Sequence, residues 1–242
     1  MALLLVGWEV ACAALRVPSY FLPPPSAIAL ALAQDAPSLA AAAWRTFSMA
    51  LEALIAASLF ATALATGVAA SRTLGHAVRP LAVALQVTPI VAVAPLFVIW
   101  AGVDHPGRAI VALATIAAFF PIFSGLVRGL ASADPDLERL FDLYGATAVQ
   151  RLLRLRVPSA TPFVIEGHKV AAGAAIIGTV VAEFVAGSGG AQGLAWRIME
   201  AGNRLQTARM FAAIIALALM AAILHAAFQT LERRALVWWR GR

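Results

Sequence analysis

Six long apolar runs decide what this chain can fold into. A helix needs about 20 predominantly apolar residues to cross the hydrocarbon core of a bilayer. The runs approach or exceed that length, and the first is the shortest. The sequence therefore predicts an all-α integral membrane protein, one domain over residues 1–242, with about six transmembrane helices at 2–18, 47–70, 80–101, 109–127, 163–186 and 208–230.

The overall composition supports this interpretation and excludes several classes of protein. Of the 242 residues, 62% are hydrophobic and 12% are charged, whereas soluble domains carry about 25% charged residues. The chain has one cysteine, Cys12, and four histidines without metal-ligand spacing, so we expect no disulfide framework and no metal site. Run 2–18 lacks a basic segment before it and is expected to be a retained first span. The segment after the prolines at 23–25 is expected to form a short interfacial helix.

The arginines indicate the orientation of the chain in the membrane, since basic residues favour cytoplasmic loops. All but one of the 18 basic residues are arginine. With six spans and a cytoplasmic N-terminus, the cytoplasmic arginines would be Arg72, Arg79, Arg128, Arg139, Arg151, Arg154, Arg156, Arg233, Arg234, Arg240 and Arg242. The smaller external set would be Arg16, Arg45, Arg108, Arg197, Arg204 and Arg209. We therefore predict that both termini face the cytoplasm, and that the basic charge follows membrane topology rather than forming a nucleic-acid patch.

The segment 134–158, between the fourth and fifth runs, carries clear helix-boundary signals. Asp134 is a typical helix N-cap and Pro135 suits the first helical position. Gly145 suits the left-handed residue that ends a helix. The sequence therefore predicts a short helix that ends in a glycine turn on the cytoplasmic side.

A second helix is expected directly after this turn. Thr147 and Gln150 have the spacing of a capping box. Pro158 predicts the end of this helix, and Thr161 with Pro162 predicts the start of the fifth span. The result would be a basic, amphipathic helix–glycine–helix hairpin. Such a hairpin either lies on anionic lipid or docks into a groove of a soluble partner subunit.

The hairpin resembles the cytoplasmic signature loop of binding-protein-dependent ABC importer permeases of the type I fold. That pattern runs Glu-Ala-Ala, three residues, Gly, nine residues, Ile-x-Leu-Pro. Gly145 is followed by nine residues and then by Leu155-Arg156-Val157-Pro158. The Glu-Ala-Ala positions hold Arg139-Leu140-Phe141, with Glu138 one place earlier.

Three further segments resemble the nitrate/sulfonate/taurine branch of this family. They read VPSYFLPPPSAI, TPIVAVAPLFVIWAG and KVAAGAAIIGTVVAEFVAGSGGAQGLAW. The words LYGA, LRVPSATP and VVAEFVAG are closer to sub-branches that import pyrimidine-type vitamin precursors or riboflavin. The resemblance implies a family core over 40–231 and a cytoplasmic coupling loop over 134–158.

The resemblance also implies the activity and its partners. The chain would be the permease subunit of an ATP-driven importer in the bacterial plasma (inner) membrane, and not an enzyme. Its partners would be two ATP-binding subunits, a second permease copy in a homodimer, and a solute-binding protein that delivers a small solute. The residues implied to couple to the ATPase are Glu138, Arg139, Leu140, Phe141, Tyr144, Gly145, Ala146, Arg151, Leu155 and Pro158.

The sequence agrees that ATP would be bound by another polypeptide. The only lysine, Lys169, lies between His168 and Val170, so the chain has no phosphate-binding loop of the G-x-x-x-x-G-K-[ST] type. We therefore expect no cofactor in this chain. The alternative function is an ion-coupled secondary transporter or channel that works without an ATPase, although the sequence shows no convincing inverted repeat.

Several residues inside the runs are candidates for the translocation pathway. Pro89 and Pro95 either line the pathway or simply bend the third span. Glu183 and Glu52 either face the pathway or form structural hydrogen bonds.

Other residues in the fifth run have simpler expected roles. Glu166 and Lys169 have the spacing of a solvated ion pair. Small residues are expected to allow close helix packing, namely Gly167, Ala171, Ala175 and Gly178.

Overall fold

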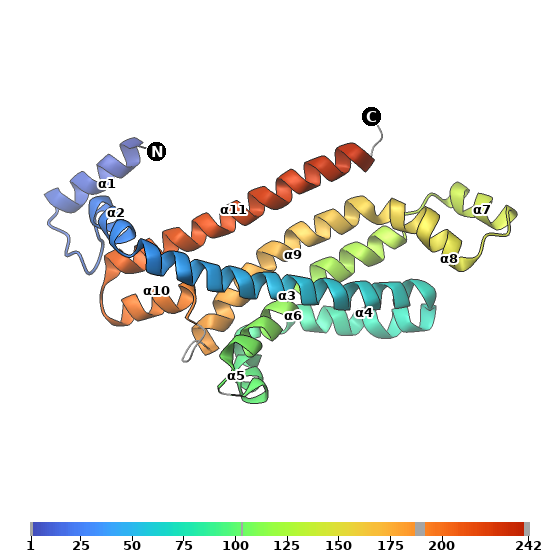
Figure 1. Cartoon of the computed structure of the whole chain (residues 1–242), viewed down its shortest axis with the longest axis horizontal. Helices are drawn as coiled ribbons and strands as arrows, with labels where there is room; N and C mark the ends of the chain where they lie inside the picture. Colours follow the sequence, from blue (N-terminus) through green and yellow to red (C-terminus); the bar gives the residue numbers. More distant parts are fainter. Residues whose placement is uncertain (1, 103, 187–191, 240–242) are drawn as a thin grey trace.

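The computed structural model describes residues 2–102, 104–186 and 192–239, which form helices and connecting turns without a strand (Figure 1). Residues 187–191, which belong to the family-like segment KVAAGAAIIGTVVAEFVAGSGGAQGLAW, lie outside the described residues. The helices in chain order are α1 (Ala2–Ala14), α2 (Pro25–Gln34), α3 (Ala36–Ala70), α4 (Arg72–Val87), α5 (Ile90–Ala101), α6 (Pro106–Leu130), α7 (Pro135–Leu143), α8 (Ala148–Arg151), the π-helical turn η1 (Leu152–Arg156), α9 (Val157–Ala186), α10 (Leu194–Asn203) and α11 (Thr207–Trp239).

Four helices of the described chain are long and apolar enough to cross a membrane. They are α3, α6, the continuous helix Ala148–Ala186 and α11. The pair α4 and α5 brings the number to five if it counts as one broken span. The first run forms only the 13-residue α1, about 20 Å long, and a bilayer core is about 30 Å thick. The structure thus confirms an all-helical protein with several helices that qualify as membrane spans by length and composition, four or five among the described residues, where the sequence predicts about six.

Small residues hold the core of the bundle together. The helices α6 and α9 approach so closely that a Cβ atom on Gly167 would lie 2.9 Å from the carbonyl oxygen of Pro121. Further along, Gly178 faces Ala114 in the same way. Ala171 and Ala175 are buried beside α3. These contacts confirm the predicted small-residue stripe, because side chains of this size let helix backbones meet.

Pro158 does not end a helix, so the predicted stop there is wrong. The helix that begins at Ala148 continues through η1 into α9 and ends at Ala186, and the predicted start of the fifth span at Thr161 is wrong for the same reason. Proline lacks an amide hydrogen and its ring crowds the preceding turn. The five-residue π-helical turn directly before Pro158 widens the helix there, which accommodates the ring without a break.

The predicted span 80–101 is interrupted instead of continuous. The helix α4 ends at Val87, and α5 begins at Ile90 at an angle of 100° to it. Pro89 occupies the extended residue before α5, with φ −65° and ψ 113°, whereas Pro95 lies inside α5. The bend expected from these prolines therefore occurs at Pro89, where α5 begins.

The two ends of the described chain lie toward different ends of the bundle. Figure 1 shows α1, α2 and α10 gathered at one end and α7 with α8 at the other, and α11 runs from the first end toward the second. The helix α1 is shorter than a membrane span, and the cytoplasmic location of both termini stays a prediction.

Candidate functional site

The turn in segment 134–158 is built as the sequence predicts. The carboxylate of Asp134 accepts a hydrogen bond from the backbone N–H of Asp136 at 2.8 Å and caps α7. Tyr144 follows the helix, and Gly145 adopts φ +62°, the left-handed region in which glycine is favoured. The confirmed glycine turn reverses the chain between α7 and α8.

The capping box at the start of α8 is also confirmed. The Thr147 hydroxyl accepts a hydrogen bond from the Gln150 backbone N–H at 3.2 Å. The Gln150 side-chain oxygen accepts one from the Thr147 backbone N–H at 2.9 Å. This reciprocal pair satisfies two amides that a helix start otherwise leaves open, and it fixes where the second helix begins.

Ion pairs centred on Glu138 join α7 to the second helix. One Glu138 carboxylate oxygen lies 2.7 Å from Arg156 Nε, and the other lies 3.5 Å from Arg151 Nε. Arg151 also pairs with Asp142 of α7. Because α7 has no buried residue, these charges replace an apolar core as the connection between the two helices.

The outer surface of the hairpin exposes large apolar side chains. Leu143 and Tyr144 are 85% and 83% exposed, and Val149 and Leu153 are also largely open. Leu155, in contrast, is buried. The other predicted coupling residues are exposed or half-buried on the hairpin, namely Arg139, Leu140, Phe141, Ala146 and Pro158. The hairpin thus exposes apolar side chains on its outside and is held together by ion pairs between its two helices. Such an apolar surface suits a partner groove or a membrane interface.

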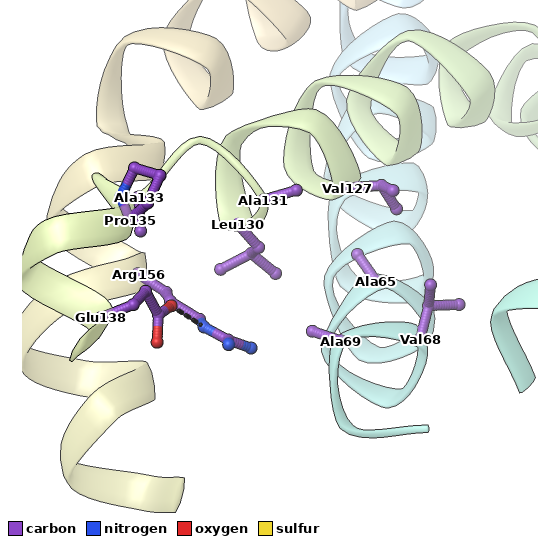
Figure 2. Close-up of a pocket in the computed structure, with 10 residues that line it drawn as sticks. All are labelled: Ala65, Val68, Ala69, Val127, Leu130, Ala131, Ala133, Pro135, Glu138 and Arg156. Atoms are coloured by element: carbon purple, nitrogen blue, oxygen red, sulfur yellow. Dashed lines mark hydrogen bonds and ion pairs between the residues drawn. The ribbon is translucent and has the colours of Figure 1, made fainter. Parts of the chain in front are cut away.

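A cavity separates the hairpin from the end of α3. Figure 2 shows the Glu138–Arg156 pair on one side of it and Ala65, Val68 and Ala69 of α3 on the other. Its volume is about 500 Å³. A second cavity of about 440 Å³ lies between Arg151 and the last turn of α3. These two cavities therefore separate much of the hairpin from the last turns of α3.

At the other end of the bundle, the buried carboxylate of Glu183 connects three helices. One Glu183 oxygen accepts a hydrogen bond from the Thr46 hydroxyl at 2.7 Å, and the other accepts one from the Ala195 amide at 2.9 Å. Thr46 accepts a hydrogen bond from the Leu194 amide at 2.9 Å. We name Thr46, Glu183 and these two amides the Glu183 joint. It attaches the start of α10 to α3 and α9.

The proline candidates lie apart from this joint. Pro89 and Pro95 are exposed on and beside α5. Ala94 of α5 packs near Ala182 of α9, but the Glu183 carboxylate makes its hydrogen bonds with Thr46 and α10. The structure places Pro89, Pro95 and Glu183 on or beside the neighbouring helices α5 and α9 without bringing their side chains into one site.

The sequence of the chain matches one known protein family. Residues 53–237 match the model of the binding-protein-dependent transport system inner membrane component. The chain belongs to this family. It is therefore a transport permease subunit and not an enzyme.

The permease is also similar to curated transport proteins along nearly its whole length. It is 32% identical to the formylaminopyrimidine transport permease protein ThiX of Halalkalibacterium halodurans, over 98% of this chain and 92% of the relative. It is 31% identical to the riboflavin transport system permease protein RibX of Chloroflexus aurantiacus, over 98% and 88%. It is 29% identical to the taurine transport system permease protein TauC of Escherichia coli, over 98% and 86%.

One predicted contact of the permease is wrong. Lys169 does not pair with Glu166, which is exposed. Instead, its ammonium group lies 2.8 Å from Glu232 Oε2 on α11. The alternative partner is 63 residues away, so helical spacing within α9 could not reveal it.

Proposed function

We propose that this permease works in an ATP-driven importer and that the hairpin 134–158 is its docking element for the ATP-binding subunit. The observation that carries the proposal is the projecting hairpin itself. Its charges are largely paired internally, while Leu143, Tyr144 and Val149 point apolar surface away from the bundle. In the alternative arrangement the same surface would rest on lipid.

The internal pairing of Glu138 refines what the hairpin would offer. The family pattern has an acidic residue at the position of Arg139, and Glu138 stands one place earlier. Here the Glu138 carboxylate is held by Arg151 and Arg156. Glu138 would therefore maintain the shape of the hairpin, and Leu140, Leu143 and Tyr144 would supply the contact surface.

The proposed orientation places the hairpin on the cytoplasmic side of a bacterial plasma membrane. Arg139, Arg151, Arg154 and Arg156 belong to the hairpin, and α11 runs toward the same end of the bundle (Figure 1). Basic residues favour the cytoplasmic side. The C-terminal end of α11 would then be cytoplasmic as well, and α10 would lie on the external side.

The same proposal includes the remaining partners and domain bounds. A second copy of this chain would complete a homodimeric pathway, and a solute-binding protein would deliver the solute to the external end. The family core would span 40–231 and the coupling loop 134–158. The family description, which names a binding-protein-dependent system, supports the binding-protein partner.

Candidate solutes follow from the relatives. Formylaminopyrimidine, riboflavin and taurine are the solutes in their names. Pro89 and Pro95 remain proposed pathway residues, Pro89 at the bend before α5 and Pro95 inside α5. For Glu183, the completed hydrogen bonds of the Glu183 joint favour the structural alternative over direct solute contact.

Site-specific cross-linking tests the docking proposal. With Cys12 replaced by serine, Leu143→Cys is expected to cross-link to the co-expressed ATP-binding subunit through a short reagent with one thiol-reactive arm and one photoreactive arm. The reason is that Leu143 is the most exposed large apolar residue of the hairpin. The measurement is the yield of the covalent permease–ATPase product on a denaturing gel.

The matched control is Phe21→Cys. Phe21 is 75% exposed in the turn before α2, and Figure 1 shows α2 at the end of the bundle opposite α7 and α8. It should give no product. Equal yields at both positions, or product only at Phe21→Cys, would show that the hairpin is not the docking element.

A further inference from the structure

A third cavity lies between α3, α5 and α6, and no residue of the hairpin or of the Glu183 joint lines it. Its volume is about 750 Å³. Glu52 and Phe60 of α3, Phe97 of α5 and Thr115 of α6 line it, and Asp104 and Arg108 stand where the chain enters α6. A cavity of this size holds a small organic molecule.

Glu52 is one of two carboxylates that line this cavity, together with Asp104, and it is exposed. It lies within the apolar run 47–70 of α3. Among the described residues it takes part in no hydrogen bond or ion pair, unlike Glu183 and Glu232, whose oxygens are engaged. An ionisable group at membrane depth normally faces a water-filled cavity or a partner, because exposure to lipid is costly. Its place on the cavity wall fits that rule.

Besides Glu52, four polar side chains line the cavity, namely Asp104, His105, Arg108 and Thr115. The Thr115 hydroxyl donates to the carbonyl oxygen of Val111 at 2.7 Å. Within the described chain, neither Glu52 nor Asp104 forms an ion pair, so the lining has two carboxylates with free acceptor oxygens against the one guanidinium of Arg108. A solute in the cavity would therefore meet a negative charge with unused hydrogen-bond acceptors.

The rest of the wall favours a flat, apolar body. Phe60 and Phe97 contribute aromatic rings, and Met49 contributes a polarizable thioether. Aromatic rings and methionine sulfur both pack well against planar rings. The lining also carries two carboxylates, Glu52 and Asp104, against one guanidinium, Arg108, so it suits a ring with N–H groups better than an anion.

We propose that Glu52 contacts the transported solute and selects planar, nitrogen-containing rings with N–H donors over sulfonates. This inference rests on the proposed function, because it assigns a solute class to the pathway of that transporter. Its first consequence concerns selectivity. A carboxylate repels a sulfonate group placed beside it and accepts hydrogen bonds from an amino or ring N–H group.

The test uses the complete transporter, with its ATP-binding subunits and binding protein, in proteoliposomes. The probes are radiolabelled formylaminopyrimidine, riboflavin, taurine and hexanesulfonate. Wild-type transporter should take up at least one of the two ring compounds about tenfold faster than either sulfonate. Glu52→Ala should lower the amount of ring compound transported per ATP hydrolysed about tenfold or more, and Glu52→Gln should lower it less, since the amide retains one acceptor oxygen.

The matched control is Glu166→Ala, which removes an exposed carboxylate of α9 that does not line the cavity. Its uptake should stay within about twofold of wild type. Co-purification with the ATP-binding subunit and basal ATP hydrolysis should be unchanged in all variants, a readout that separates a solute contact from loss of folding.

The outcomes distinguish this inference from the proposed function. Faster uptake of taurine or hexanesulfonate, or uptake of neither ring compound, overturns the solute class. Equal transport ratios for Glu52→Ala and Glu166→Ala overturn the role of Glu52. Failure of the wild-type chain to associate with an ATP-binding subunit overturns the proposed function itself.

Discussion

Gly193→Ala is expected to destabilise the permease more than any other small substitution considered in this structure. A Cβ atom at this position would overlap both Glu183 Oε1 and Thr46 Oγ1, at separations well under 3.0 Å. Both atoms are buried and hydrogen-bonded, and the backbone on either side is held by the Glu183 joint. Neither neighbour can therefore move without losing a buried hydrogen bond.

The expected loss is about 3 kcal/mol or more of the free energy of unfolding, because breaking a buried polar network adds to overpacking. For a chain of this size, such a loss lowers the melting temperature by about 6 °C or more. The measurement is thermal unfolding of the purified permease in detergent, with the fraction of monodisperse protein recorded at each temperature.

The control for this substitution is Gly173→Ala on α9. A Cβ atom there would meet nothing within 4 Å, so its melting temperature should equal that of wild type or exceed it slightly. If Gly193→Ala and Gly173→Ala melted at the same temperature, the Glu183 joint would not be the tight, buried connection described above.

Gly145→Val is expected to separate ATPase binding from membrane folding. Gly145 has φ +62°, a conformation that a β-branched residue strongly disfavours. A Cβ atom there would meet nothing within 4 Å, so the effect would come from the backbone alone. Relaxation of the turn would misalign Glu138 with Arg151 and Arg156.

We expect Gly145→Val to reduce the co-purified ATP-binding subunit about tenfold, while the amount of permease in the membrane stays within about twofold of wild type. Asparagine tolerates the left-handed conformation far better than valine. Gly145→Asn should therefore retain most of the binding. Equal recovery of the ATP-binding subunit with valine and asparagine would show that the left-handed turn at Gly145 is not needed for docking.

Local signals in the sequence were sufficient for the start of α7, the glycine turn after it and the start of α8. Asp134, Gly145 and the Thr147–Gln150 capping box each act over two to four residues, and the structure confirms all of them. The small-residue stripe of α9 is equally local, because its helical spacing places those residues on one face.

The predictions that the structure contradicts or lacks concern interactions that rules based on neighbouring residues do not include. Pro158 is a helix breaker by residue type, but a π-helical turn directly before it keeps the helix continuous. The helix α10, which no sequence signal indicated, begins where Glu183 and Thr46 hold its first amides.

Contacts between residues far apart in the sequence could not be predicted from the sequence either. Glu183 meets Thr46 across 137 positions, and Arg156 meets Glu138 across 18. An intramembrane carboxylate indicates that some partner or cavity exists. Only the packing of the helices shows that Glu183 has partners and that Glu52 faces a cavity.

The most direct measurement of the central claim is solute uptake with and without ATP. The permease, its ATP-binding subunits and its binding protein would be reconstituted in proteoliposomes with ATP and Mg²⁺ enclosed on the hairpin side. We predict uptake against a gradient only when ATP is enclosed, and background uptake when it is replaced by ADP. Uptake that persists at the same rate without ATP, driven by an ion gradient, would contradict an ATP-driven importer and favour a secondary transporter.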